Sequence, residues 1–185
     1  MITKNDAILA LYPTTGFTTS GGEIVQWDST DPQPTEQEIE VKLAELKYQE
    51  EVNVYQKKRK SEYPDWGDQL DQIYHSGIDV WKSDIKVIKD KYPKQTMDAT
   101  ELQKRKDAAI FKLQKRDYEK AVARLAQYEL SAGVKDKDGN YIIEPLPLWV
   151  DGGRNPEIVE DEKQRETAQE VINKTPQAVI DSINT

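Results

Sequence analysis

Apolar residues recur at helical spacing along most of the chain, and this pattern predicts a mainly α-helical protein. One seam is formed by three residues that step by four and three positions: Ile39, Leu43 and Leu46. Thr35 and Glu38 precede it with the spacing of a capping box. No strong helix breaker follows before Pro64. The sequence therefore predicts one long helix over residues 35–62, whose narrow seam suits a helix–helix contact.

A second helical pattern lies between two Tyr-Pro pairs, in residues 64–93. Gly77 divides it into two short apolar-periodic runs, which predicts a helical hairpin with a tight turn. Its predicted interior consists of five residues: Leu70, Ile73, Trp81, Ile85 and Ile88. The polar residues of this segment, including the single histidine His75, are then expected on the outer face and at the helix caps. We interpret the segment as a packing unit.

A third helix is predicted over residues 100–132. Thr100 and Gln103 are its expected capping pair, and Gly133 is expected to end it. Its main seam is formed by Phe111, Tyr118, Val122 and Leu125, followed by either Tyr128 or Glu129.

Strand-like sequence is confined to short stretches. Gly21-Gly22 and Asp138-Gly139 each lie between two β-prone runs, and each pair predicts a hairpin. The first hairpin follows a short helix, and such a small unit is expected to lean on another element. Residues 144–157 are proline-rich and predict an irregular extended arm. A helix near 160–173 and a short helical end after Pro176 complete the chain.

These elements predict a mainly α (α+β) fold of elongated form, with three regions. Residues 1–34 form a small helix and β-hairpin unit. Residues 35–132 form a helical region around the hairpin at 64–93. Residues 133–185 form a β-hairpin, the proline-rich arm and a helical tail.

Composition favours thin helical layers over one thick core. Of the 185 residues, 36% are hydrophobic and 32% are charged, and the net charge is −8. This negative balance argues against a nucleic-acid surface, and the basic run at 57–60 lies in a predicted helix as a solvated face. No cysteine is present, which excludes disulfides, thiol catalysis and cysteine-based zinc sites. No apolar run approaches the length of a membrane span, so we expect a soluble protein made in a cytoplasm, with no membrane or nucleic-acid partner.

No residue pattern points to catalysis or to a cofactor. Asp71 and His75 lie four residues apart and supply two metal ligands at most. Residues 136–140 resemble the start of a calcium loop, but the glycine falls at the fourth position instead of the sixth, which favours a hairpin turn. The sequence has no Gly-rich phosphate loop, nucleophile elbow or HExxH motif. We therefore predict a non-enzymatic protein with no catalytic, cofactor-binding or metal-ligating residues.

Trp149 differs from the other three tryptophans because its proline-rich surroundings offer no local core. Two interpretations are open. The side chain is an anchor for a protein partner, or it packs on the chain's own long helix. The candidate partner-binding residues fall into two groups, one in the arm and one in the helical seam: Leu146, Leu148 and Trp149, and Ile39, Leu43 and Leu46.

Several segments resemble proteins of tailed bacteriophages. The stretches NDAILALYPTTGF, GGEIVQWDS and PQPTEQEIEVKLAELK are similar to the phage XkdW-like family of small proteins, which are encoded beside tail-fibre genes and are usually tail-associated. The stretches YPDWGDQLDQIYHSGID and IKVIKDKYPK resemble a helical-hairpin motif of phage structural proteins, especially those of cyanophages. DYEKAVARLAQYELSAG is similar to sequences of cyanophage virion proteins. The resemblance covers roughly residues 3–133, and the family has no established catalytic residues to carry over.

The resemblance implies a structural protein of the virion in the tail, baseplate or tail-fibre region. Its implied partners are tail-fibre, baseplate or tail-tube proteins, and it is expected to be an oligomer in the particle. Its implied location is the virion, after assembly in the host cytoplasm. The expected interfaces are the helices at 35–62 and 100–132 and the Pro-Leu-Trp arm. The alternative is an assembly chaperone for a tail fibre, which would share the acidic charge and apolar seams but be absent from the mature particle.

Overall fold

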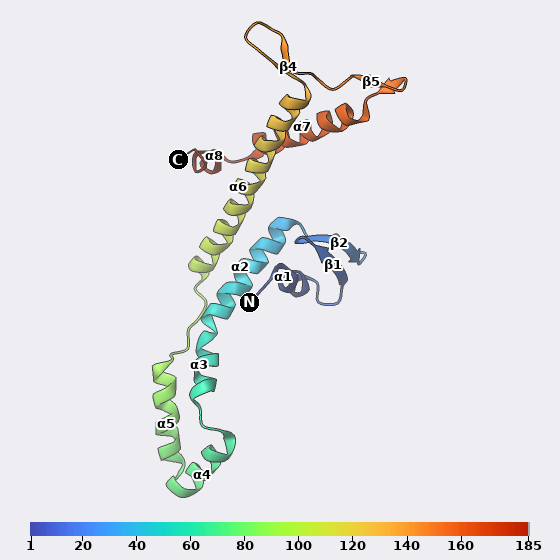
Figure 1. Ribbon diagram of the computed structural model, residues 1–185. Coiled ribbons are helices and arrows are strands. Elements are labelled where there is room, and N and C mark those ends of the chain that lie inside the picture. Colours follow the sequence, from blue (N-terminus) through green and yellow to red (C-terminus); the bar gives the residue numbers. More distant parts are fainter. Residues whose placement is uncertain (185) are drawn as a thin grey trace. The chain divides into compact units, whose positions relative to one another are not determined.

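The computed structural model describes residues 1–184, apart from the side chains of residues 129–131, and helices account for 62% of the chain (Figure 1). The prediction of a mainly α (α+β) fold is confirmed. The residues pack into two compact units, Met1–Ala109 and Ile110–Thr185, and the boundary falls within α6 (Ala99–Ser131). The division into regions after residues 34 and 132 stays a prediction. Within the described residues, all strand pairing is antiparallel and two-stranded.

The first unit begins with α1 (Lys4–Leu11), followed by strands β1 (Gly16–Ser20) and β2 (Glu23–Asp28). Thr3 caps α1, because its side chain accepts a hydrogen bond from the Asp6 backbone while the Asp6 carboxylate accepts one from the Thr3 backbone N–H at 2.7 Å. The predicted hairpin is confirmed. Its turn is Gly21-Gly22, with φ values of 59° and 88° that glycine adopts without steric cost.

The core of this small unit is completed by the next helix, α2 (Glu36–Val52). Four buried side chains form it: Ala7, Ile8, Ile39 and Leu43. Trp27 packs against it, with the Tyr12 ring edge-on at a centroid distance of 5.0 Å. The small unit was expected to lean on another element, and that element is α2. Ile39 and Leu43 of α2 belong to the core of this unit.

Helix α2 ends at Asn53, and a separate helix, α3 (Val54–Glu62), continues the chain. The prediction of one unbroken helix over 35–62 is therefore wrong at this point. Asn53 has φ −89° and ψ 0°, and its side chain accepts a hydrogen bond from Gln56. Asparagine is a weaker helix former than most of its neighbours in this segment, which favours a break at this position. The Thr35–Glu38 capping box at the start of α2 is confirmed.

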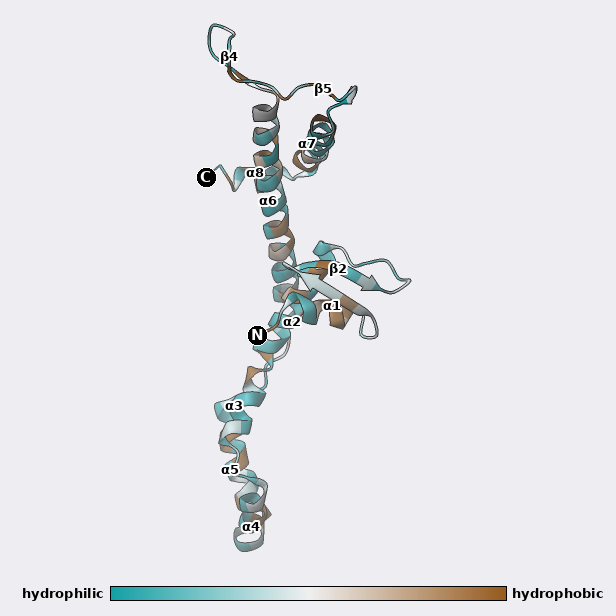
Figure 2. Ribbon diagram, turned by 45° about the vertical axis from the view of Figure 1, so that its right-hand side comes forward, coloured by the Kyte–Doolittle hydropathy of each residue, from teal (hydrophilic) through white to brown (hydrophobic). Residues whose placement is uncertain are grey.

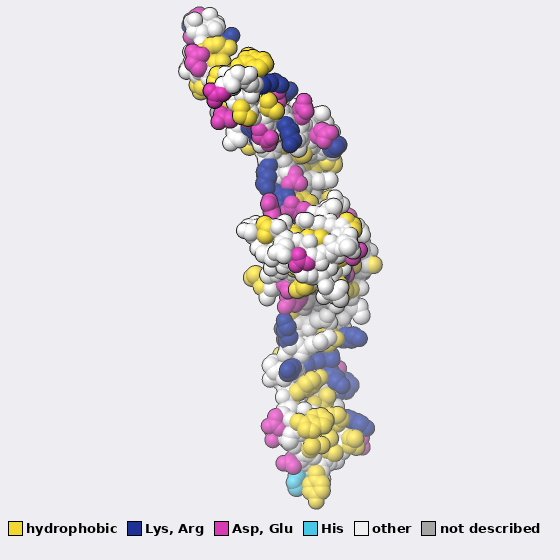
Figure 3. All heavy atoms as spheres, turned by 90° about the vertical axis from the view of Figure 1, so that its right-hand side faces the viewer, with side chains coloured by type: hydrophobic (Ala, Val, Ile, Leu, Met, Phe, Trp, Pro, Cys, Tyr) yellow, Lys and Arg dark blue, Asp and Glu magenta, His cyan; other side chains and the backbone are white. Residues whose placement is uncertain are grey.

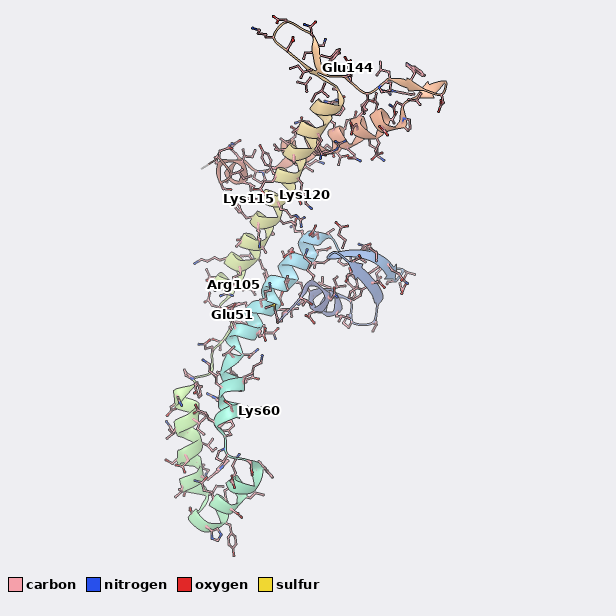
Figure 4. All side chains as sticks on the ribbon, in the orientation of Figure 1. Glu51, Lys60, Arg105, Lys115, Lys120 and Glu144 are labelled. Atoms are coloured by element: carbon pink, nitrogen blue, oxygen red, sulfur yellow. The ribbon has the colours of Figure 1, made fainter. Side chains whose placement is uncertain are left out.

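The first turns of α6 pack beside the C-terminal half of α2, within the first unit. The Tyr48 hydroxyl accepts a hydrogen bond from the Asp98 backbone at 3.1 Å, and the Arg105 guanidinium lies 4.4 Å from the Tyr48 ring centroid. Arg105 also pairs with Glu51 at 2.7 Å; both side chains are labelled in Figure 4. The start of α6 is capped by Asp98, which accepts from the Glu101 backbone at 2.8 Å. The predicted cap at Thr100 was wrong by two residues.

The predicted helical hairpin is confirmed as α4 (Trp66–Ser76) and α5 (Ile78–Lys91), which meet at Gly77 with φ 85°. Ile85 is buried between them, and the Trp81 indole donates to Gln69 at 3.2 Å. Leu70, predicted to lie inside, is 50% exposed. Arg59 of α3 joins the hairpin to the rest of the unit by donating to the Tyr92 and Lys89 carbonyls at 2.8 and 3.0 Å, where the end of α5 leaves its carbonyls unpaired.

The second unit contains the remainder of α6, then α7 (Pro156–Lys174) and α8 (Gln177–Asp181), which confirm the predicted helical tail. Two small residues, Ala121 and Ala168, are buried on α6 and α7 and together line one groove. Arg124 pairs with Asp161, and the Arg165 guanidinium lies 5.0 Å from the Tyr128 ring centroid. Along the predicted apolar side of α6, Tyr118 and Leu125 are half-buried, whereas Phe111 and Val122 are exposed.

Candidate partner-binding surface

The surface that we single out lies between α6 and α7 in sequence and consists of two short hairpins and the proline-rich segment that joins them. The first hairpin pairs β3 (Val134–Lys135) with β4 (Tyr141–Ile143). The second pairs β5 (Trp149–Val150) with β6 (Gly153–Arg154). We call residues 144–155 the arm. Hydrophobic residues colour β4 and the start of the arm in Figure 2.

Gly133 sets the path of the chain out of α6. Its φ is 88°, and a Cβ placed there would lie 2.9 Å from the Pro145 backbone nitrogen and 2.9 Å from the Tyr141 ring. Both the backbone conformation and the lack of room require glycine. The predicted end of the helix at this residue is confirmed, and the close approach brings the start of the arm against the base of the β3–β4 hairpin.

The turn of the β3–β4 hairpin is held by Asp136. Its carboxylate accepts from the backbone N–H groups of Asp138 and Asn140 at 2.9 and 3.0 Å. The hydrogen bond from the Asn140 backbone holds the pKa of Asp136 below its usual value. Residues 136–140 thus form a hairpin turn, as predicted.

Asn155 fixes the other end of the arm and is buried. Its side-chain amide donates to the Pro147 carbonyl at 2.8 Å, and its side-chain oxygen accepts from the Glu157 backbone at 3.0 Å, capping α7. Its backbone N–H donates to the Leu148 carbonyl at 2.9 Å. One side chain therefore ties the proline-rich segment to the start of a long helix, which restricts the conformations open to the arm.

The arm is not irregular throughout, as the sequence had suggested. Residues 149–154 form a hairpin whose turn is Asp151-Gly152, with φ values of 51° and 82°. Positive φ at both central residues is the geometry that an Asp-Gly pair favours in two-residue hairpins. This dipeptide signal was present in the sequence, and the neighbouring prolines obscured it. Arg154 stands opposite Trp149 in the register and pairs with Glu162 of α7 at 2.7 Å.

The arm presents apolar side chains to solvent and borders a cavity. Trp149 is 69% exposed, and Leu148 and Val150 are exposed beside it. Leu146 is half-buried and lines, with Leu148, a cavity of about 280 Å³. The remaining lining residues come from α6 and the residue that follows it, from β4, from the arm and from α7: Tyr128, Ala132, Tyr141, Pro145, Ile158, Asp161 and Glu162. Exposed tryptophans are frequent anchors of protein interfaces.

The two groups of candidate residues have different surroundings. Leu146, Leu148 and Trp149 lie together on the arm. Ile39 and Leu43 are buried in the core of the first unit, and Leu46 is packed against that core. The chain's own α1 and first hairpin cover Ile39 and Leu43, so a partner has no access to these two side chains while this core is folded, whereas Leu46 is partly buried. Exposed residues Tyr141, Ile142 and Ile143 of β4 were not among the candidates, although they lie next to the arm.

The described part of the chain offers neither a metal site nor a helix suited to a bilayer. No group of three or more His, Asp or Glu side chains is placed there to hold a metal ion. His75 is exposed, with its ring edge-on to Tyr74 at 4.9 Å. In the same part of the chain, no helix has the length and apolar content needed to cross a membrane.

Comparison with known proteins found no matching family model, no matching curated protein and no matching solved structure.

Proposed function

We propose that this protein is a non-enzymatic structural component that acts through protein–protein interfaces, and that it belongs to the tail, baseplate or tail-fibre region of a phage virion. The exposed indole of Trp149 on an arm held by Asn155 carries the first part of this proposal. The sequence resemblance to phage tail-associated and virion proteins supports the second part.

The arm combines features that favour binding a protein. When a partner covers large apolar side chains that face solvent, the removal of their surface from water favours binding. The Asp151-Gly152 turn and the Asn155 hydrogen bonds order the backbone before binding, which lowers the entropic cost of association. Partners of suitable chemistry are tail-fibre, baseplate or tail-tube proteins that offer an apolar recess for an indole.

Mass spectrometry of gradient-purified phage particles beside the crude lysate tests the proposal. We expect the protein in the particle at a fixed ratio to the major tail proteins. Abundance in the lysate with none in the particle would overturn the structural assignment and favour the tail-fibre assembly chaperone.

A phage that encodes Trp149→Ala tests the anchor itself. We expect incorporation to fall at least about tenfold, since truncation of an anchoring tryptophan costs on the order of 2 kcal/mol of binding. Val25→Ala is the matched control, because Val25 is an exposed apolar residue of a hairpin in the other unit. Equal incorporation of the two variants would exclude Trp149 as the anchor.

A further inference from the structure

The first unit contains a cavity that is separate from the arm. It lies where the end of α5 and the loop after it meet α3, and its volume is about 280 Å³. Two tyrosine rings, Tyr55 and Tyr92, line it together with Val54 and Pro93, so part of its wall is apolar. The remaining lining residues are polar or charged: Glu51, Lys58, Lys91 and Gln95. We call this space the α3–α5 cavity.

The loop that closes the α3–α5 cavity, residues 92–98, is held at both ends. At its start, Arg59 donates to the Tyr92 carbonyl at 2.8 Å. At its end, the Asp98 backbone N–H donates to the Tyr48 hydroxyl at 3.1 Å. The cavity is therefore formed before any ligand binds, which lowers the entropic cost of binding.

Two carboxylates near the cavity already have basic partners. Glu51 pairs with Arg105 at 2.7 Å. Glu62 accepts a hydrogen bond from the Lys91 ammonium at 2.6 Å and another from the Tyr92 hydroxyl. The bond from Lys91, followed by that from Tyr92, lowers the pKa of Glu62. Glu62 is therefore ionised at neutral pH and balances the charge of Lys91.

Lys58 has no carboxylate partner. Its ammonium lies 5.9 Å from the Tyr92 ring centroid, at the cavity wall, and it forms no ion pair with the side chains that the structure describes. Arg59, the next residue, binds carbonyls at the end of α5 and so covers the negative end of that helix. The Gln95 side chain has no hydrogen-bond partner in the described part of the chain. The cavity wall thus offers an ammonium and an amide that are both available as donors.

The members of the basic run at 57–60 have different surroundings. Lys57 pairs with Glu50 at 2.9 Å, and Arg59 is bound to backbone carbonyls. Lys60 is exposed and does not line the α3–α5 cavity. Figure 3 shows Lys and Arg side chains gathered over the part of the first unit that contains α3, between its two hairpins. Because only some of these cations are free, the run does not offer the row of charges that a nucleic-acid backbone needs.

We propose that the α3–α5 cavity binds a small organic anion, in which a carboxylate or phosphate group pairs with Lys58 and a flat apolar part packs on Tyr55 and Tyr92. The charged hydrogen bond to the ammonium holds the anionic group. Burial of the ring against the tyrosines adds to the affinity. One aromatic ring with its anionic group fits within about 280 Å³. A cation of the same size would be repelled by Lys58 and Arg59.

A nuclear magnetic resonance titration of the isotope-labelled full chain with phenyl phosphate tests this proposal. Ionic strength is held constant, because salt screens the charges. We expect saturable shifts of backbone amide signals in residues 54–58 and 91–95. Inorganic phosphate lacks the ring and should bind at least about tenfold more weakly. Benzylammonium carries the opposite charge and should cause no saturable shift.

A pair of lysine variants separates the cavity from the general charge of α3. Lys58→Gln removes the proposed ion partner and should weaken phenyl phosphate binding about tenfold. Lys60→Gln is the matched control, because it removes the same charge from the same helix outside the cavity; Lys60 is labelled in Figure 4. This control should bind phenyl phosphate as the unmodified chain does. Circular dichroism checks that both variants keep their helix content.

A lack of saturable shifts with phenyl phosphate would overturn the proposal. Equal losses in the two variants would also overturn it, because the effect would then belong to net charge. Binding of benzylammonium as tight as that of phenyl phosphate would do the same. None of these results bears on the arm, so the proposed function would stand or fall independently.

Discussion

The two units each contain a tryptophan-bearing hairpin with a two-residue turn, and the two tryptophans have opposite environments. The turns are alike, since Gly21-Gly22 and Asp151-Gly152 all have positive φ. Trp27 packs against Tyr12 and Phe17 and donates its indole N–H to the Asp31 carbonyl at 2.8 Å. Trp149 stands opposite Arg154 and is mostly exposed. In both cases the two-residue turn is sufficient to form the hairpin. Whether the tryptophan is buried depends on whether a neighbouring helix supplies an apolar face for it.

The comparison predicts unequal costs when each hairpin loses an apolar side chain. Ile8, 1% exposed, lies in the core beneath the first hairpin. Ile8→Ala should lower the free energy of unfolding of the first unit by about 3 kcal/mol through lost burial and a residual cavity. Trp149→Ala should change stability by less than about 0.5 kcal/mol. Urea unfolding followed by circular dichroism measures both. A large loss for Trp149→Ala would show that the indole packs in solution and would remove the contrast.

The first hairpin is held by an apolar core, whereas the second hairpin is held by hydrogen bonds of Asn155. Asn155→Ala leaves the Pro147 carbonyl and the Glu157 backbone N–H without their partner and should cost about 2 kcal/mol locally. Hydrogen exchange by mass spectrometry should show faster exchange in residues 148–160. Asn173→Ala is the control, since Asn173 is an exposed residue of the same helix. Unchanged exchange in the Asn155 variant would mean that β5 and β6 are held by other contacts.

A smaller effect is expected at the start of α2, which supports the first hairpin. Thr35→Ala removes the side-chain oxygen that accepts from the Glu38 backbone at 3.2 Å and should cost about 1 kcal/mol. Thr100→Ala is the matched control, because the structure places the cap of α6 at Asp98 instead. Thermal unfolding measures both variants. Equal losses would restore Thr100 as a capping residue.

The smallest expected effect is a pH dependence in the first unit. Hydrogen bonds from the Thr3 side chain and backbone lower the pKa of Asp6, and the bond from the Thr35 backbone N–H, followed by that from its side chain, lowers the pKa of Glu38. A carboxyl whose pKa is lowered on folding contributes stability above its unfolded pKa and loses it as pH falls through the folded value. We expect stability to decline below pH of about 4. Glu38→Gln should make that decline shallower in urea titrations, and an identical decline would contradict the assignment.

The sequence predicted what short-range rules decide. The Thr35–Glu38 box, the stop at Gly77 and the hairpin at Asp138-Gly139 all depend on residues within a few positions of one another, and all are confirmed. Where two local signals competed, the prediction failed. Asn53 broke a helix that periodicity alone continued, and the Asp151-Gly152 turn was hidden among prolines.

Only part of the candidate surface was predicted from the sequence. The exposure of a side chain depends on tertiary packing, which the spacing of residues along the chain does not determine. An apolar seam has the same spacing whether its partner is another segment or another molecule. Ile39 and Leu43 were therefore candidates for a partner, although α1 covers them. Leu70 was assigned to an interior, although it faces solvent. For the arm, the lack of a neighbouring helical period correctly indicated that Trp149 has no local core.

The crowding at Gly133 has a genetic consequence. Every missense change of a glycine codon adds at least a Cβ, and here that atom meets the backbone of Pro145 and Ile143 as well as the Tyr141 ring. Backbone atoms cannot rotate away as a flexible side chain can, so even alanine should be selected against. Gly139, which also has positive φ but no atom within 4 Å of a Cβ, should tolerate asparagine. A saturation library of the gene scored by the amount of folded protein should therefore lose nearly all variants at codon 133 and keep some at codon 139.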